Sequence, residues 1–121
     1  MPGCEWINYQ DKKILYIDLV SDSHEKMKKT CYKAALEIAQ QPPNSVLCIT
    51  NTKGGRFFRE TPQLLKEFTK TNEPYVRMTA VIGVEGFQVV LYTGILRFTK
   101  RKNLVLKDTK EEALDWLAGL E

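Results

Sequence analysis

The residue types best suited to binding chemistry stand in one loop that directly follows the apolar run Val46–Ile49. Two adjacent glycines let this backbone approach a partner closely and adopt positive φ, while a lysine and an arginine add positive charge. A helix start just downstream adds to the preference for anions. We therefore predict a ligand- or partner-binding site built from Asn51, Thr52, Lys53, Gly54, Gly55 and Arg56. The loop is not a Walker-type phosphate-binding loop, because its motif is absent. The alternative is that the two glycines only turn the chain.

A second loop with two glycines, Gly83-Val84-Glu85-Gly86, follows another apolar run. It lacks the GxGxxG pattern of dinucleotide-binding turns, so no nucleotide cofactor is expected. Asp18 and Glu85 could approach each other at the same rim, where burial can raise the pKa of one carboxyl group for acid–base work. Two solvated acids are the simpler interpretation. We add Gly83 and Glu85 to the predicted binding site and expect no catalytic residue.

Cysteine and histidine usage narrows the chemistry further. His24 is the single histidine, and Cys4, Cys31 and Cys48 are widely spaced with no CxxC pair. We therefore expect neither a metal site nor a bound cofactor. An odd cysteine count, together with an N-terminus that lacks a basic-then-apolar leader, predicts reduced thiols in a cytoplasmic protein. No apolar run approaches ~18 residues, so no transmembrane segment is expected.

One basic cluster stands out in a chain whose formal net charge is only +3, and it consists of Arg97, Lys100, Arg101 and Lys102. Cations at the end of a helix are stabilised by the helix dipole, which is the simpler explanation. The alternative is contact with phosphates or with an acidic partner. Nucleic acid is not the expected partner, because that function usually needs a larger clustered basic face.

The elements that must position these residues follow from hydrophobic periodicity. Strands are predicted at 6–9, 14–17, 46–49, 78–82 and 104–106, and helices at 23–40, from 61, at 86–99 and from 109. This order, β-β-α-β-α-β-α-β-α, predicts one α/β domain over residues 1–121. Its sheet is expected to be mostly parallel and five-stranded, with an N-terminal antiparallel hairpin and four helices.

Three helix starts carry capping signals. Asp22 followed by Glu25, and Thr109 followed by Glu112, are predicted capping boxes, and Thr61 before Pro62 is a predicted N-cap. At the C-terminus, Trp116 and Leu117 are expected to pack on the sheet.

The predicted helix 86–99 is apolar on nearly every side. Neighbouring elements of the same chain can cover part of that surface. The residues on its other sides, Val89, Tyr92 and Leu96, are predicted to form a homodimer seam or to contact a lipophilic ligand.

The strand Thr79-Ala80-Val81-Ile82-Gly83 before that apolar helix, and the terminal segment Glu111–Leu117, carry a family resemblance. The chain resembles the SpoIIAA-like family, within the group of STAS (sulfate transporter and anti-sigma factor antagonist) domains, from about Trp6 to Leu120. The resemblance implies the STAS-type α/β sheet, which is related to the CRAL-TRIO lipid-binding fold.

The resemblance also implies where function would lie. Anti-anti-sigma factors carry a phosphorylated serine in a D-x-S-G stretch; here Asn51 takes the place of the aspartate and Lys53 that of the serine. This argues against a kinase switch at that position. A non-enzymatic binding or regulatory module, recognising a protein partner or a small apolar or anionic ligand, is the first hypothesis. A carrier of lipids or other lipophiles is the second, and an enzyme using Asp18, Glu85 or Lys53 is the weakest.

Overall fold

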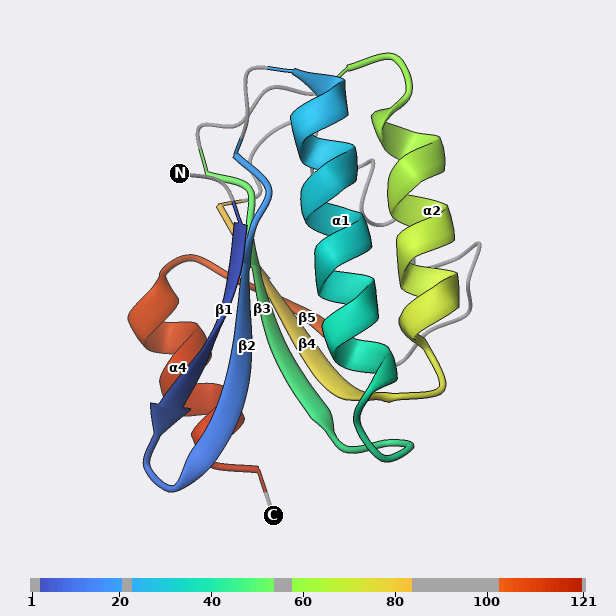
Figure 1. Cartoon of the computed structure of the whole chain (residues 1–121). Helices are drawn as coiled ribbons and strands as arrows, with labels where there is room; N and C mark the ends of the chain where they lie inside the picture. Colours follow the sequence, from blue (N-terminus) through green and yellow to red (C-terminus); the bar gives the residue numbers. More distant parts are fainter. Residues whose placement is uncertain (1–2, 21–22, 54–57, 84–102, 121) are drawn as a thin grey trace.

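The protein is built on one five-stranded sheet with the strand order β1-β2-β3-β4-β5 (Figure 1). A computed structural model describes residues 3–20, 23–53, 58–83 and 103–120. The strands are β1 (Gly3–Tyr9), β2 (Lys12–Asp18), β3 (Val46–Asn51), β4 (Val76–Ile82) and β5 (Leu104–Lys107). The described helices are α1 (His24–Ala39), α2 (Thr61–Asn72) and α4 (Lys110–Ala118).

The predicted topology is confirmed for these elements. β1 and β2 pair antiparallel around the turn Gln10–Asp11, and each later strand pairs parallel to the one before it. Gln10 and Asp11 have φ values of 48° and 66°, the sign that a tight two-residue hairpin turn requires at both positions. The parallel strands explain why β2 and β3 read as apolar on both sides, since helices cover both faces of such a sheet.

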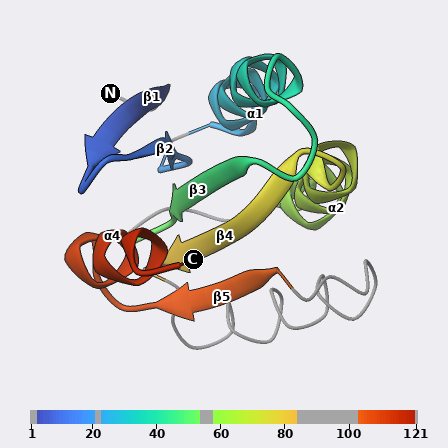
Figure 2. The same cartoon turned by 90° about the horizontal axis from the view of Figure 1, so that it is seen from below.

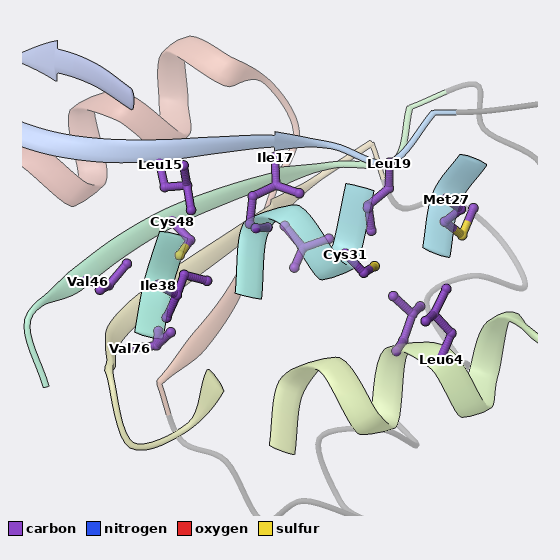
Figure 3. Close-up of a cluster of buried hydrophobic side chains, with 13 residues drawn as sticks. Leu15, Ile17, Leu19, Met27, Cys31, Ile38, Val46, Cys48, Leu64 and Val76 are labelled. Atoms are coloured by element: carbon purple, nitrogen blue, oxygen red, sulfur yellow. The ribbon is translucent and has the colours of Figure 1, made fainter. Parts of the chain in front are cut away.

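α1 and α2 cover one face of the sheet and α4 covers the other (Figures 1 and 2). The α1/α2 face holds the larger core (Figure 3), made of Leu15, Ile17, Leu19, Met27, Cys31, Ala34, Ile38, Val46, Cys48, Leu64, Leu65, Val76 and Val81. The α4 face holds a smaller one, made of Ile14, Leu47, Ile49, Ala80, Ile82, Ala113, Leu114 and Leu117. Trp116 is half-buried and packs against this second core, so the expected docking of the terminal helix is confirmed.

The N-terminal cap of α1 differs from the prediction. Ser23, not Asp22, is the N-cap: its backbone is extended, with φ −145° and ψ 148°, and its Oγ accepts a hydrogen bond from Lys26 N at 3.2 Å. The helix therefore begins one residue later than a capping box at Asp22 and Glu25 would require. Asp22 and Ser23 both carry side chains that can cap a helix, so the sequence alone does not decide between them.

Thr61 is also not the cap that the sequence predicts for α2. Glu60 stands at the N-cap without a side-chain cap, and Thr61 is the first helical residue, fully buried. Its Oγ1 accepts a hydrogen bond from Phe58 N at 2.8 Å. The Thr61 hydroxyl thus accepts a hydrogen bond from the loop before the helix and not from an N–H of the first helical turn. The prediction at α4 is confirmed, because Thr109 Oγ1 accepts from Glu112 N at 3.1 Å.

The helix expected at 86–99 lies outside the described residues, so the structure does not test it. Among the helices that are described, none is long and apolar enough to span a membrane.

Candidate partner-binding site

The carboxyl ends of β2, β3 and β4 meet at one edge of the sheet. In the parallel register Asp18 pairs with Asn51, and Asn51 pairs with Ile82. Asp18 Oδ1 accepts hydrogen bonds from Val20 N at 3.0 Å and from Asn51 Nδ2 at 3.4 Å. The Asp18 carboxylate is therefore engaged in holding the chain as it leaves β2, which is a structural use of a residue considered for acid–base chemistry.

Thr52 anchors the start of the predicted loop to β4. Its backbone N and its Oγ1 both donate to the carbonyl oxygen of Ile82, each at 2.9 Å, and its side chain is buried. The Thr52 hydroxyl is thus used internally and faces away from any incoming partner. Its place in the site is to fix the backbone from which the next residue projects.

Lys53 is the residue that this anchor displays. Its N–H donates to Asn51 Oδ1 at 3.1 Å, while its side chain is exposed. Gly83 packs directly beneath it with φ +81°, and a Cβ atom at Gly83 would lie 2.4 Å from the Cα and N of Lys53. Only glycine fits there, because a side chain would meet both backbone strain and backbone atoms. The sequence predicted that Gly83 and Lys53 belong to one site, and they do lie together. The role of Gly83 there is to leave room for the Lys53 backbone.

A hollow of about 350 Å³ opens beside Lys53 on the α4 face. Its walls come from the ends of four strands and the start of α4, and comprise Tyr16, Asn51, Lys53, Ile82, Gly83, Asp108, Thr109, Lys110 and Glu111. Lys110 Nζ lies 4.4 Å from the centroid of the Tyr16 ring, which is a cation–π distance. This volume falls within the range of about 300–1,000 Å³ typical of ligand sites.

Sequence reasoning missed most of the α4 side of this hollow. Tyr16 read as one residue of an apolar strand, and Lys110 and Glu111 read as the first turn of a helix. One feature of the sequence could have indicated these residues, namely their place in the predicted order of elements. In a parallel sheet the carboxyl end of β5 and the start of α4 reach the same edge as the ends of β3 and β4.

The electrostatics of the hollow are mixed. Burial raises the pKa of the Tyr16 hydroxyl above its ordinary value of 10.0, and the carboxylates of Asp18 and Glu5 add to the shift. Tyr16 is therefore a neutral donor at physiological pH. Two cations, Lys53 and Lys110, and two acidic residues, Asp108 and Glu111, line the walls. Within the described ranges, no three His, Cys, Asp or Glu side chains are grouped so that they could hold a metal ion.

Several predicted site residues lie outside the described residues. These are Gly54, Gly55, Arg56 and Glu85 of the two loops, Val89, Tyr92 and Leu96 of the expected seam, and Arg97, Lys100, Arg101 and Lys102 of the basic cluster. The proposed approach of Asp18 and Glu85 is untested for the same reason.

A second space lies inside the α1/α2 face. Its described walls are apolar or carry hydroxyl and amide groups, and include Ile17, Leu65, Phe68, Asn72 and Val81. The cavity holds about 30 Å³, the room of about one water molecule. This space is too small for a lipid chain.

Comparison with solved structures identifies the fold as STAS-like. No family model matches the chain, and no curated protein matches its sequence. The structure is similar to that of an anti-sigma-factor antagonist (STAS) domain protein from Planctomyces limnophilus, with a TM-score of 0.61 and 15% sequence identity. The match covers 97% of this chain and 99% of that one. The STAS-like fold implied by the sequence resemblance is therefore confirmed.

Proposed function

We propose that this chain is a single-domain, non-enzymatic regulatory module that binds a protein partner at the carboxyl edge of its sheet. The observation that carries the proposal is the display of Lys53 beside the hollow. Asn51 Oδ1 accepts the N–H of Lys53, Thr52 bonds to Ile82, and Gly83 packs against the Lys53 backbone. The exposed Lys53 side chain therefore projects from a backbone that is held in place. Pre-organised contact residues bind with a smaller entropy loss. The cytoplasm, where its thiols stay reduced, is the proposed location.

The charge pattern favours a protein over a small anion. The acidic side chains of Asp108 and Glu111 offset the two lysines, so the formal charges of the described walls sum to zero. A protein surface can match alternating charges across such an edge, and electrostatic complementarity of this kind gives specificity.

The carrier and enzyme alternatives draw less support from the described residues. The space of about 30 Å³ that the described residues line on the α1/α2 face does not accommodate a lipid. Asp18, one of the two carboxylates considered for catalysis, accepts hydrogen bonds from Val20 N and Asn51 Nδ2. Native mass spectrometry of the purified protein separates the carrier from the binding module, because a carrier retains a lipid mass and the module does not.

The partner site is tested by site-specific photo-cross-linking in the source cell. A photo-reactive residue replaces Lys53 in one variant and Lys29 in the other; Lys29 is an exposed lysine of α1 on the opposite face. We expect a discrete adduct from position 53 that is absent from position 29. The adduct protein is then identified by mass spectrometry, purified and titrated against the parent chain.

The charge-reversal pair Lys53→Glu and Lys29→Glu gives the decisive measurement. Lys53→Glu is expected to weaken the complex by about tenfold or more, while Lys29→Glu leaves the dissociation constant unchanged. Both side chains are exposed, so both variants should melt at the parent temperature. Equal affinity for parent and Lys53→Glu, or a co-purified lipid, would reject the proposed function.

A further inference from the structure

The strand β1 has one open edge. It pairs with β2 on one side over its full length, from Gly3↔Asp18 to Tyr9↔Lys12, and no other described element lies beyond it (Figure 2). A strand at the edge of a sheet carries unpaired N–H and C=O groups that can pair with another strand.

The hairpin geometry shows which residues supply these groups. The two-residue turn makes Tyr9 and Lys12 a hydrogen-bonded pair, and such pairs alternate along an antiparallel ladder. Gly3, Glu5, Ile7 and Tyr9 therefore direct their backbone groups toward β2. The remaining residues of the strand, Cys4, Trp6 and Asn8, direct theirs outward.

β1 has few of the features that prevent edge pairing, and its one charged side chain is that of Glu5. It contains no proline and no lysine, and its register with β2 is continuous over seven residues. By contrast, β5 at the other edge has only four residues and ends in Lys107. Edge strands are commonly protected by shortness, lysine, proline or bulges, and β1 has none of these.

We propose that β1 pairs antiparallel with β1 of a second copy, about a two-fold axis that passes midway between the two Trp6 residues. The outward-facing positions are symmetric about Trp6, so Cys4 of each copy faces Asn8 of the other, and the two Trp6 residues face each other. None of these side chains is charged. Glu5 comes opposite Ile7 of the second copy, so no like charges meet in the paired strands. A two-fold interface uses one surface twice, and this strand is complementary to itself.

Contacts within the chain hold the central residue in place. Trp6 is half-buried against the α1/α2 core, its Nε1 donates to Glu37 Oε2 at 3.3 Å, and Lys13 Nζ lies 4.2 Å from its ring centroid. The indole is thus oriented by α1 and β2 before any partner arrives. A side chain with few conformations left to lose suits the centre of an interface.

A cysteine cross-link tests the register. In the proposed pair the Cα atoms of Cys4 and position 8 of the second copy are ~5.5 Å apart, within the range for a disulfide. Within one chain these positions lie ~13 Å apart along a strand, so they cannot join. Mild oxidation of Asn8→Cys should give a covalent dimer whose peptide map joins Cys4 to position 8. The parent and the double variant Cys4→Ser, Asn8→Cys should not form this link.

A proline substitution tests the hydrogen bonding. Asn8→Pro removes an outward N–H without removing a bond to β2, and it is expected to weaken the dimer by about tenfold or more in sedimentation equilibrium, with the circular dichroism spectrum retained. The matched variant Tyr92→Glu, Leu96→Glu should leave this dimer intact. A parent that stays monomeric at high micromolar concentration overturns the proposal, as does a dimer lost only in the Tyr92/Leu96 variant. If Asn8→Pro does not fold, a cross-link missing from Asn8→Cys overturns it alone.

Discussion

The described helices cover the two faces of the sheet to very different extents. Over one face lie α1 and α2, with 16 and 12 residues, and over the other lies α4 with nine (Figure 2). The α1/α2 face has the larger aliphatic core, with the half-buried aromatic residues Trp6, Phe58, Phe68 and Tyr75 packed against it. The α4 face has a shorter aliphatic core and a rim of half-buried aromatic residues, Tyr9, Tyr16 and Trp116.

Polar contacts fasten the rim of the α4 face. The Tyr9 hydroxyl donates to Asp115 and Lys12 Nζ donates to the carbonyl oxygen of Leu120, which ties the hairpin to α4. Lys107 Nζ lies 5.2 Å from the centroid of the Trp116 ring. Among the described elements one short helix covers this face, and the hollow beside Lys53 opens where that helix begins. Within the described part of the chain, the candidate site thus lies at the end of the sheet where α4 starts.

Truncating the core on each face should give the largest effects. Leu117→Ala and Ile38→Ala remove side chains that are fully buried or nearly so on the α4 and α1/α2 faces, and each is expected to cost about 2–5 kcal/mol. Urea denaturation measures both. Leu117 is one of three buried residues of α4, so its loss should also expose the amides of α4 to hydrogen exchange.

Trp116→Ala provides the control for this comparison. Trp116 is only half-buried, so the larger share of the docking energy of α4 is expected from Leu117. A Leu117→Ala protein that unfolds at the parent's urea midpoint would show that α4 contributes little to the α4 face.

Removing a helix cap on each face should have an intermediate effect. Thr109→Ala and Ser23→Ala each delete an oxygen that accepts a backbone N–H, at a cost of about 0.5–2 kcal/mol. The loss of stability should be larger for Thr109→Ala, because α4 has only nine residues to pack against the sheet whereas α1 has 16. Thermal melts of both variants, with Thr109→Ser as a conservative control, measure the difference. A larger loss for Ser23→Ala would contradict this order.

The thiols of the α1/α2 face should show the smallest effect, seen in reactivity. Burial raises the pKa of Cys31 from its ordinary value of 9.0 to about 12, and Cys48 is buried in the same core, whereas Cys4 is half-buried. Cys4 should therefore react first with a thiol reagent, and all three should react after denaturation without reductant. Rapid labelling of Cys31 in the folded protein would contradict the packing of this face.

The raised pKa of Cys31 also sets a pH dependence. The unfolded thiol ionises above pH 9.0 while the folded one remains protonated until about pH 12, so stability from this group is full below pH 9.0 and declines as the pH rises. Cys31→Ala should flatten that part of the stability curve.

The amino-acid sequence by itself determined the order of the described elements, the β1–β2 hairpin and the Thr109 cap. These features depend on residues a few positions apart, where periodicity and capping act directly. The resemblance in the β4 strand and the terminal helix extended this to the STAS-like fold.

Only the tertiary structure decided how the candidate site is built. Thr52 turned inward because the carbonyl oxygen of Ile82, 30 residues away, accepts its hydroxyl, and Thr61 gave its oxygen to Phe58. The hollow joins Tyr16, Lys53 and Lys110 from segments far apart in the chain. Their meeting depends on the register of parallel strands and on where α4 lands on the sheet, and no local pattern encodes either.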